Sequence, residues 1–146
     1  MSRQSNVENI MMLVGGILLA AGAGCYAFLL VRPLAAVCFL VGAVVFCLIQ
    51  QRQIVPLRRD GGLTLRRLCA IMTFAHLLFL LSGLLMVEEQ FQPVGRILAE
   101  RDTTGGARYI SFVTVVYGKW VVMLLIASIL ELYTTQRISA ETKDEE

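Results

Sequence analysis

His76, the only histidine of the chain, is the side chain best suited to acid–base chemistry. It lies in a long apolar segment, where an ionisable group marks a candidate proton relay because imidazole changes its charge near neutral pH. A relay needs a second proton carrier, and we expect no Asp or Glu at the same depth in any apolar segment. We therefore predict that His76 hydrogen-bonds to Thr73, Ser82 or a hydroxyl of another helix. The proton relay is the alternative.

Lys119 raises a similar question, because it lies inside the apolar stretch VVYGKWVVMLLIASILELY, residues 115–133. A lysine stem can carry its ammonium group toward the headgroups when it starts near a membrane boundary. The preceding apolar segment ends beside Glu88 and Glu89, at the same boundary if the two segments are antiparallel. We therefore predict an ion pair between Lys119 and Glu88 or Glu89. The alternative is a small transporter or channel subunit, with Lys119 and His76 lining a water-filled path.

Glu131 lies near the opposite boundary of that segment, where Arg66 and Arg67 precede the neighbouring one. We predict a second ion pair there, between Glu131 and Arg66 or Arg67. The whole stretch 50–67 is basic, and a basic stretch next to a membrane attracts anionic headgroups. The residues predicted to contact lipid headgroups are Arg52, Arg58, Arg59, Arg66 and Arg67.

The chain has four cysteines, and all of them lie within apolar segments. Their spacing contains no C-x-x-C pair and no zinc-ligand pattern. Cys25 and Cys38 fall at similar depths on either side of the Arg32-Pro33 turn. A disulfide between them would support a weaker alternative, a membrane thiol protein. We favour four buried thiols that pack as small apolar side chains.

No other set of residues indicates catalysis. We find no serine-histidine-acid set, no metal-ligand cluster and no glycine loop that could hold a phosphate. We therefore predict no enzyme activity, no cofactor and no bound metal. The formal net charge of +2 is too small to indicate nucleic acid as a partner.

Four apolar segments must position these residues, because the charged residues, 16% of the chain, gather between the segments and at the ends. An apolar run of about 18 or more residues can cross a bilayer as a helix. We predict spans at about 10–31, 34–49, 68–87 and 111–132. The predicted fold is an all-α membrane protein, a single domain over 1–146 with its four transmembrane helices in an up-down antiparallel bundle.

The distribution of basic residues predicts the orientation of the spans. The N-terminus, the stretch 50–67 and the C-terminal tail together carry eight Lys and Arg residues, against four in the other two connections. Cytoplasmic connections carry an excess of these residues. We therefore predict that both termini lie in the cytoplasm.

The remaining long connection, 88–109, has features of a helix. Phe91, Val94, Ile97 and Leu98 share one helical face, and Pro93 is suited to the first position of a helix. We predict a short interfacial helix here, lying on the outer leaflet. It would cap the bundle or contact an external partner.

The first apolar segment carries small residues at a spacing typical of close helix packing. Gly16, Ala20 and Gly24 recur every four residues, which lets helix backbones approach one another in lipid. We predict that this face packs on the second span in a hairpin. The alternative is contact with another membrane protein or with a second copy of the chain.

The segments RRLCAIMTFAHLLFLLSG and KWVVMLLIASILELYTTQRI resemble a group of small, functionally uncharacterised four-helix inner-membrane proteins of Bacteroidetes-type bacteria. The resemblance implies an inner-membrane location and no particular activity. Together with the absence of a catalytic motif, it favours a non-enzymatic structural or accessory subunit that packs with other membrane components.

Overall fold

The computed structural model of the protein describes residues 2–60, 62–101 and 106–144. These residues form six helices and, within the described ranges, no strand. The helices are α1 (Ser2–Ala27), α2 (Arg32–Asp60), α3 (Leu63–Phe91), α4 (Pro93–Arg101), α5 (Ala107–Val116) and α6 (Lys119–Asp144). The all-α prediction is therefore confirmed.

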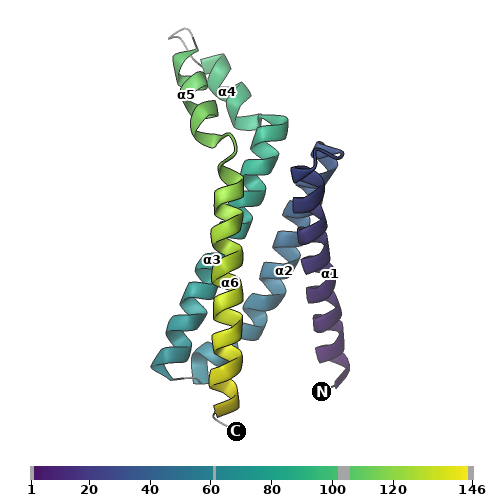
Figure 1. The fold of residues 1–146 in the computed structure, drawn as a ribbon, viewed down its shortest axis with the longest axis vertical. Helices are drawn as coiled ribbons and strands as arrows, with labels where there is room; N and C mark the ends of the chain where they lie inside the picture. The colour runs from purple at the N-terminus through teal and green to yellow at the C-terminus, as the bar shows by residue number, and fades with distance from the viewer. Residues whose placement is uncertain (1, 61, 102–105, 145–146) are drawn as a thin grey trace.

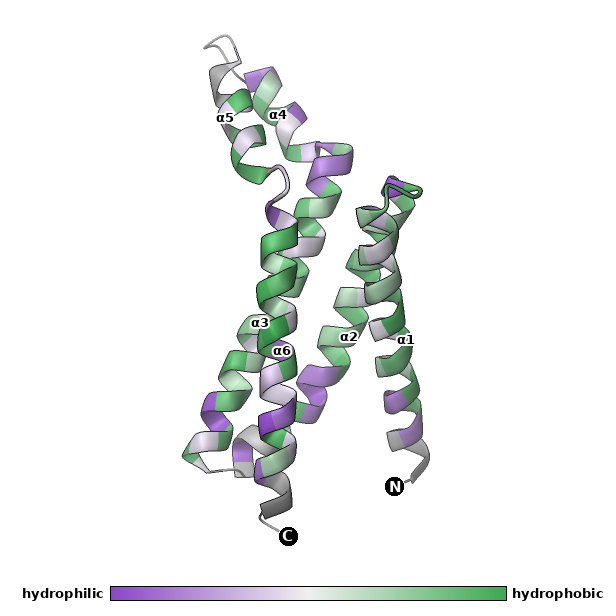
Figure 2. Ribbon diagram, viewed as in Figure 1, coloured by the Kyte–Doolittle hydropathy of each residue, from purple (hydrophilic) through white to green (hydrophobic). Residues whose placement is uncertain are grey.

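Four helical stretches are long and apolar enough to cross a membrane, as a multi-pass membrane protein requires. Figure 2 shows hydrophobic residues over the middle of the long helices and hydrophilic ones gathered toward their ends. The stretches are Asn6–Ala27, Arg32–Pro56, Leu63–Phe91 and Tyr109–Glu141. All four begin before the predicted spans or end after them, because polar and basic residues such as Gln and Arg extend a helix readily.

The extension matters most between the second and third helices. The stretch 50–67 was predicted as a loop, but α2 continues to Asp60 and α3 begins at Leu63. Arg52, Arg59, Arg66 and Arg67 are exposed on these helix ends, and Arg58 also lies in α2. Their contact with lipid headgroups stays a prediction.

The fourth predicted span, 111–132, is not one continuous helix. It is broken at Tyr117 and Gly118, between α5 and α6. Gly118 has a φ of 72°, a left-handed conformation that glycine adopts without a steric penalty. Its backbone N–H donates to Glu89 Oε2 at 3.3 Å, so a side chain of α3 holds the break in place.

The predicted helix in the connection 88–109 is present as α4, and it begins at Pro93 as expected. Glu88 accepts hydrogen bonds from the backbone N–H groups of Val94 (3.1 Å) and Gly95 (2.9 Å). Its carboxylate thus satisfies donors that the first turn of a helix leaves unpaired. The position of α4 at a membrane interface stays a prediction.

The long helices pack in series: α1 on α2, α2 on α3, and α3 on α6. Both chain ends lie at one end of the molecule, here called the terminal end, and the α1–α2 turn lies toward the other, the far end (Figure 1). Near the terminal end α1 and α6 lie apart, and α2 crosses between them (Figure 1). Near the far end Tyr26 of α1 meets Trp120 of α6, with ring centroids 5.0 Å apart.

The predicted α1–α2 hairpin is formed, but through a different stripe of small residues. A Cβ atom on Gly22 would lie 2.7 Å from the backbone nitrogen of Phe39, so the two backbones are in direct contact there. Gly42 is equally close to α1. By contrast, a Cβ on Gly24 would have nothing within 4 Å, and Ala20 is exposed. Of the predicted face only Gly16 approaches α2, where a Cβ atom would lie 3.8 Å from the Phe46 ring, so Ala20 and Gly24 lie outside the tight contact.

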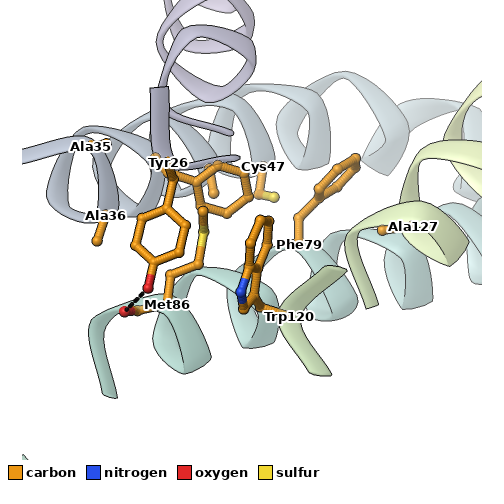
Figure 3. Packing of buried hydrophobic residues seen from close by; sticks show 10 residues of the cluster. Tyr26, Ala35, Ala36, Cys47, Phe79, Met86, Trp120 and Ala127 are labelled. Carbon is orange, nitrogen blue, oxygen red and sulfur yellow. Dashed lines mark hydrogen bonds between the residues drawn. The ribbon is translucent and has the colours of Figure 1, made fainter. Parts of the chain in front are cut away.

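The main core joins all four long helices. Figure 3 shows Tyr26, Phe79, Met86 and Trp120 packed together, with the Tyr26 hydroxyl donating to the Met86 carbonyl at 3.4 Å. Ser82 donates to the carbonyl of Trp120 at 3.0 Å and so ties α3 to the start of α6. This core lies toward the far end, and the candidate site lies on the terminal side of it.

Candidate functional site

Four polar side chains from three helices meet in the interior of the molecule. His76 of α3 is 2% exposed, and its Nδ1 atom lies 2.9 Å from Gln51 Nε2. Its Nε2 atom lies 3.2 Å from Gln50 Oε1 and 3.5 Å from Glu131 Oε2. Gln50 Nε2 also donates to Glu131 Oε1. We call Gln50, Gln51, His76 and Glu131 the polar cluster.

The serial packing of the helices assembles this cluster. Gln50 and Gln51 are adjacent on α2, and α2 and α6 both pack on α3, so the two amides and Glu131 reach the same imidazole. The surroundings are apolar or weakly polar. The Cys47 thiol lies 3.7 Å from the backbone oxygen of His76, and the Phe46 ring lies edge-on to the imidazole at 6.3 Å.

The hydrogen bonds indicate a neutral imidazole. With the Gln51 amide nitrogen against Nδ1, that ring nitrogen accepts a hydrogen bond and the Nε2 atom carries the hydrogen. The Nε2–H group then points at Gln50 Oε1 and Glu131 Oε2. The charge of the cluster is therefore the charge of Glu131: one negative charge when the carboxyl is ionised and none when it is protonated.

Glu131 is the least satisfied member of the cluster. Its side chain is 13% exposed, and its Oε2 atom is buried without a hydrogen-bond partner within the described ranges. The nearest group to that oxygen is the His76 ring nitrogen, at a distance beyond a good hydrogen bond. A buried carboxylate oxygen without a full set of donors is costly, so this atom is where a proton or ligand would bind.

Three predictions about these residues are wrong. Glu131 is the acidic partner of His76 that the sequence was expected to lack. The hydroxyls predicted to satisfy His76 bond elsewhere, since Thr73 donates to the Cys69 carbonyl (2.8 Å) and Ser82 to Trp120. Glu131 pairs with His76 and Gln50 and not with Arg66 or Arg67, which are exposed.

The physical reason is the length of α6. That helix continues to Asp144, so Glu131 lies thirteen residues before its end and not at a membrane boundary. The second span was also predicted to end at residue 49, just before the glutamines, whereas α2 runs on for another nine residues after Gln51. The adjacent pair Gln50-Gln51 inside a helix was the signal that could have located the cluster.

The cluster opens onto a groove between α1 and α6. One pocket of about 380 Å³ is lined by Glu131, Gln50 and apolar side chains that include Leu19, Phe46 and Leu132. A second pocket of about 350 Å³ adjoins it toward the terminal end and shares Gln50 with it. The groove exists because α1 and α6 touch near Trp120 and separate below it.

Lys119 was predicted either to pair with Glu88 or Glu89 or to line a path with His76, and the structure shows neither arrangement among the described residues. Glu88 bonds to the N-terminus of α4, and Glu89, whose side chain is 5% exposed, bonds to Gly118 and faces Arg32 at 3.8 Å. The predicted ion pair of Lys119 with Glu88 or Glu89 is therefore wrong. Lys119 is exposed, and the break at Gly118 explains why Glu89 binds a backbone group instead.

Lys119 is also far from His76. It lies twelve residues before Glu131 on the same helix, about 18 Å at the helical rise of 1.5 Å per residue. The path lined by both Lys119 and His76 is not formed by the described residues.

The cysteines carry no disulfide in the structure. Cys25 and Cys38 line a common apolar pocket of about 210 Å³ between α1 and α2, as their predicted similar depth requires. The prediction of four buried thiols is wrong for Cys25, which is exposed, while Cys47 is buried. Among the described residues no group of three or more His, Cys, Asp or Glu side chains could hold a metal ion.

Comparisons with protein-family models, with curated proteins and with solved structures found no match to this chain.

Proposed function

We propose that this multi-pass membrane protein binds and releases a proton at Glu131, as a small transporter or channel subunit. The observation that carries the proposal is the contact of Glu131 with His76 and Gln50 inside an apolar helix assembly. Ionisable side chains inside membrane segments are costly and typically belong to substrate, ion or proton pathways. His76 and Lys119 were predicted from the sequence as residues that could line such a pathway. The proposal keeps His76 and replaces Lys119 with Glu131.

Both protonation states of Glu131 have partners in the cluster. The ionised carboxylate accepts from the Gln50 amide at Oε1, and its Oε2 atom faces the His76 Nε2 atom at 3.5 Å. The protonated carboxyl keeps the Gln50 bond at Oε1 and carries its hydrogen on Oε2, the oxygen without a hydrogen bond. Among the residues that the structure describes, no Lys or Arg lines the pocket that holds Glu131, so proton binding at Glu131 removes the negative charge there.

The test is infrared difference spectroscopy of the reconstituted protein while the pH is lowered. We expect a carbonyl band of a protonated carboxyl at the high frequency of an apolar site, apart from the bands of the exposed carboxyls, and we expect Glu131→Gln to remove this high-frequency band. The matched control is Glu141→Gln, on the same helix but paired with Arg137 near the terminal end. A high-frequency carboxyl band that survives in Glu131→Gln would contradict the proposal.

We further propose that the four spans alternate in direction in a bacterial inner membrane, with both termini in the cytoplasm. The excess of Lys and Arg at the terminal end supports this orientation. Single cysteines can test it in a background without the native four. A cysteine in place of exposed Arg101 should react with an impermeant reagent in intact cells, and one in place of exposed Arg59 should not. The reverse pattern would overturn the orientation.

The second candidate function is an accessory subunit that packs with other membrane components. The face of Gly16, Ala20 and Gly24 favours it, because small residues at this spacing suit a helix partner and none of the described helices packs closely on Ala20 or Gly24. Crosslinking in native membranes distinguishes this function from the first. Ala20→Leu should abolish a crosslinked complex while leaving the infrared band of Glu131 unchanged.

A further inference from the structure

The groove beside Glu131 has the size and lining of a ligand site. Its two adjoining pockets, of about 380 and 350 Å³, share the lining residues Met12, Gln50 and Thr135. Sites for small molecules have volumes in this range and combine apolar walls with a few polar groups. Here the lining combines apolar side chains with polar ones, and Glu131 is the charged one among the polar residues Gln50, Gln53, Ser128, Glu131, Thr135 and Ser139.

The groove is negatively charged when Glu131 is ionised. Glu131 contributes one negative charge when ionised, and the imidazole of His76 meets the amide nitrogen of Gln51 at Nδ1 and the amide oxygen of Gln50 at Nε2. The charged residue next along α6, Arg137, pairs with Glu141 at 3.6 Å, and neither lines the pocket that holds Glu131. From α1 the groove receives Met12 and Leu19, which carry no charge.

The hydroxyl group of Ser128 in this wall does not change this balance. Ser128 donates to the Leu124 carbonyl of its own helix at 2.8 Å, which leaves its hydroxyl occupied. The buried Oε2 atom of Glu131 thus has no donor within hydrogen-bonding distance among the described groups of this wall. A ligand that carries both positive charge and apolar surface matches such a site, because each part meets its complement.

We infer that the groove between α1 and α6 binds a lipophilic organic cation in exchange for the proton of Glu131. The inference rests on the proposed function, since the same carboxyl must bind a proton. In the exchange, the protonated carboxyl of Glu131 releases its hydrogen as H⁺ and the carboxylate forms an ion pair with the entering cation. One cation enters for each proton released, so charge is conserved.

The route of entry follows from the helix arrangement. The contact of Tyr26 with Trp120 closes the groove toward the far end, and the separation of α1 and α6 opens it nearer the terminal end. An amphiphilic cation that dissolves in the bilayer can therefore reach Glu131 sideways from the lipid. It does not have to cross the core around Phe79 and Met86.

The test uses two probes of nearly the same shape and opposite charge, tetraphenylphosphonium and tetraphenylborate. Binding is measured by equilibrium dialysis of the detergent-solubilised protein, and proton release by an indicator dye in weak buffer. We expect tetraphenylphosphonium alone to bind, with one proton released per cation. Glu131→Gln should weaken its binding about ten-fold or more, while Glu141→Gln should leave it unchanged.

A second variant tests the location of the site without touching the acid. Ser128 is exposed on the groove wall, so Ser128→Trp should fold normally and fill the pocket. We expect it to weaken tetraphenylphosphonium binding about ten-fold while the infrared band of Glu131 is kept. Unchanged binding in this variant would overturn the assignment to this groove.

The outcomes separate the two proposals. If the carboxyl band titrates but tetraphenylphosphonium binds equally to wild type and Glu131→Gln, the cation site is wrong and the proton site stands. If tetraphenylborate binds as well as the cation, the groove takes up any apolar molecule, such as a lipid chain, and the inference is also overturned. If no carboxyl band titrates, the proposed function fails first.

Discussion

Replacing Gly42 with alanine should destabilise the protein by about 2 to 3 kcal/mol, because it forces the α1–α2 hairpin apart. A Cβ atom at this position would lie 2.6 Å from the backbone nitrogen of Leu19 and 3.0 Å from the carbonyl oxygen of Gly15. Backbone atoms cannot move aside by changing a rotamer, so the helices themselves must separate. Unfolding in mixed micelles with increasing denaturing detergent would measure the loss.

The matched control for this substitution is Gly24→Ala. Gly24 is also a helical glycine of the hairpin, but a Cβ there would have nothing within 4 Å. Because alanine has a better helix propensity than glycine, this variant should be as stable as wild type or slightly more so. Equal losses at Gly42 and Gly24 would mean that the close approach of α1 and α2 does not contribute to stability.

Replacing His76 with leucine should cost about 2 kcal/mol, at the upper end for hydrogen bonds inside membrane proteins. The reason is that one imidazole serves three partners. Its loss leaves the Gln51 amide, the Gln50 carbonyl oxygen and the Glu131 carboxylate with fewer bonds in a buried site. The measurement is again unfolding in mixed micelles.

Two further variants identify the source of that loss. Thr73→Val removes a hydroxyl that donates only to its own helix, at the Cys69 carbonyl, and should cost much less. In a double-mutant cycle, His76→Leu and Glu131→Gln should be less damaging together than the sum of the single changes, since each removes a partner of the other. Additive losses would show that His76 and Glu131 do not interact.

The sequence was sufficient to predict that the chain is helical and has four segments of membrane length. Both conclusions depend on local properties: an apolar run must satisfy its backbone hydrogen bonds internally when it is out of water, and a helix does so within one segment. The start of α4 at Pro93 was predictable for a similar reason, since the ring of proline suits the first turn of a helix. The ends of the long helices were predicted less well. The predicted bounds followed the apolar residues, whereas helical hydrogen bonding continues into the polar residues beyond them.

The pairing of polar residues depended on tertiary structure. Glu131 was assigned to a boundary and to arginine partners, but the length of α6 and the crossing of α2 bring it to His76 and Gln50. Lys119 lost its expected partner because the break at Gly118 presents a backbone N–H group to Glu89. Which side chains come within hydrogen-bonding distance depends on the depth, rotation and crossing angle of both helices.

The same distinction applies to the small residues of α1 and to the groove. Sequence spacing identified Gly16, Ala20 and Gly24 as a surface for close packing, yet α2 packs on the neighbouring stripe that contains Gly22. Two small-residue stripes a fraction of a turn apart look alike in sequence, and only the crossing of the partner helix selects between them. The sequence thus determined the class of protein and the residues available for chemistry. The tertiary structure determined that a carboxylate, an imidazole and an amide meet beside a groove, because α1 and α6 touch at one end only.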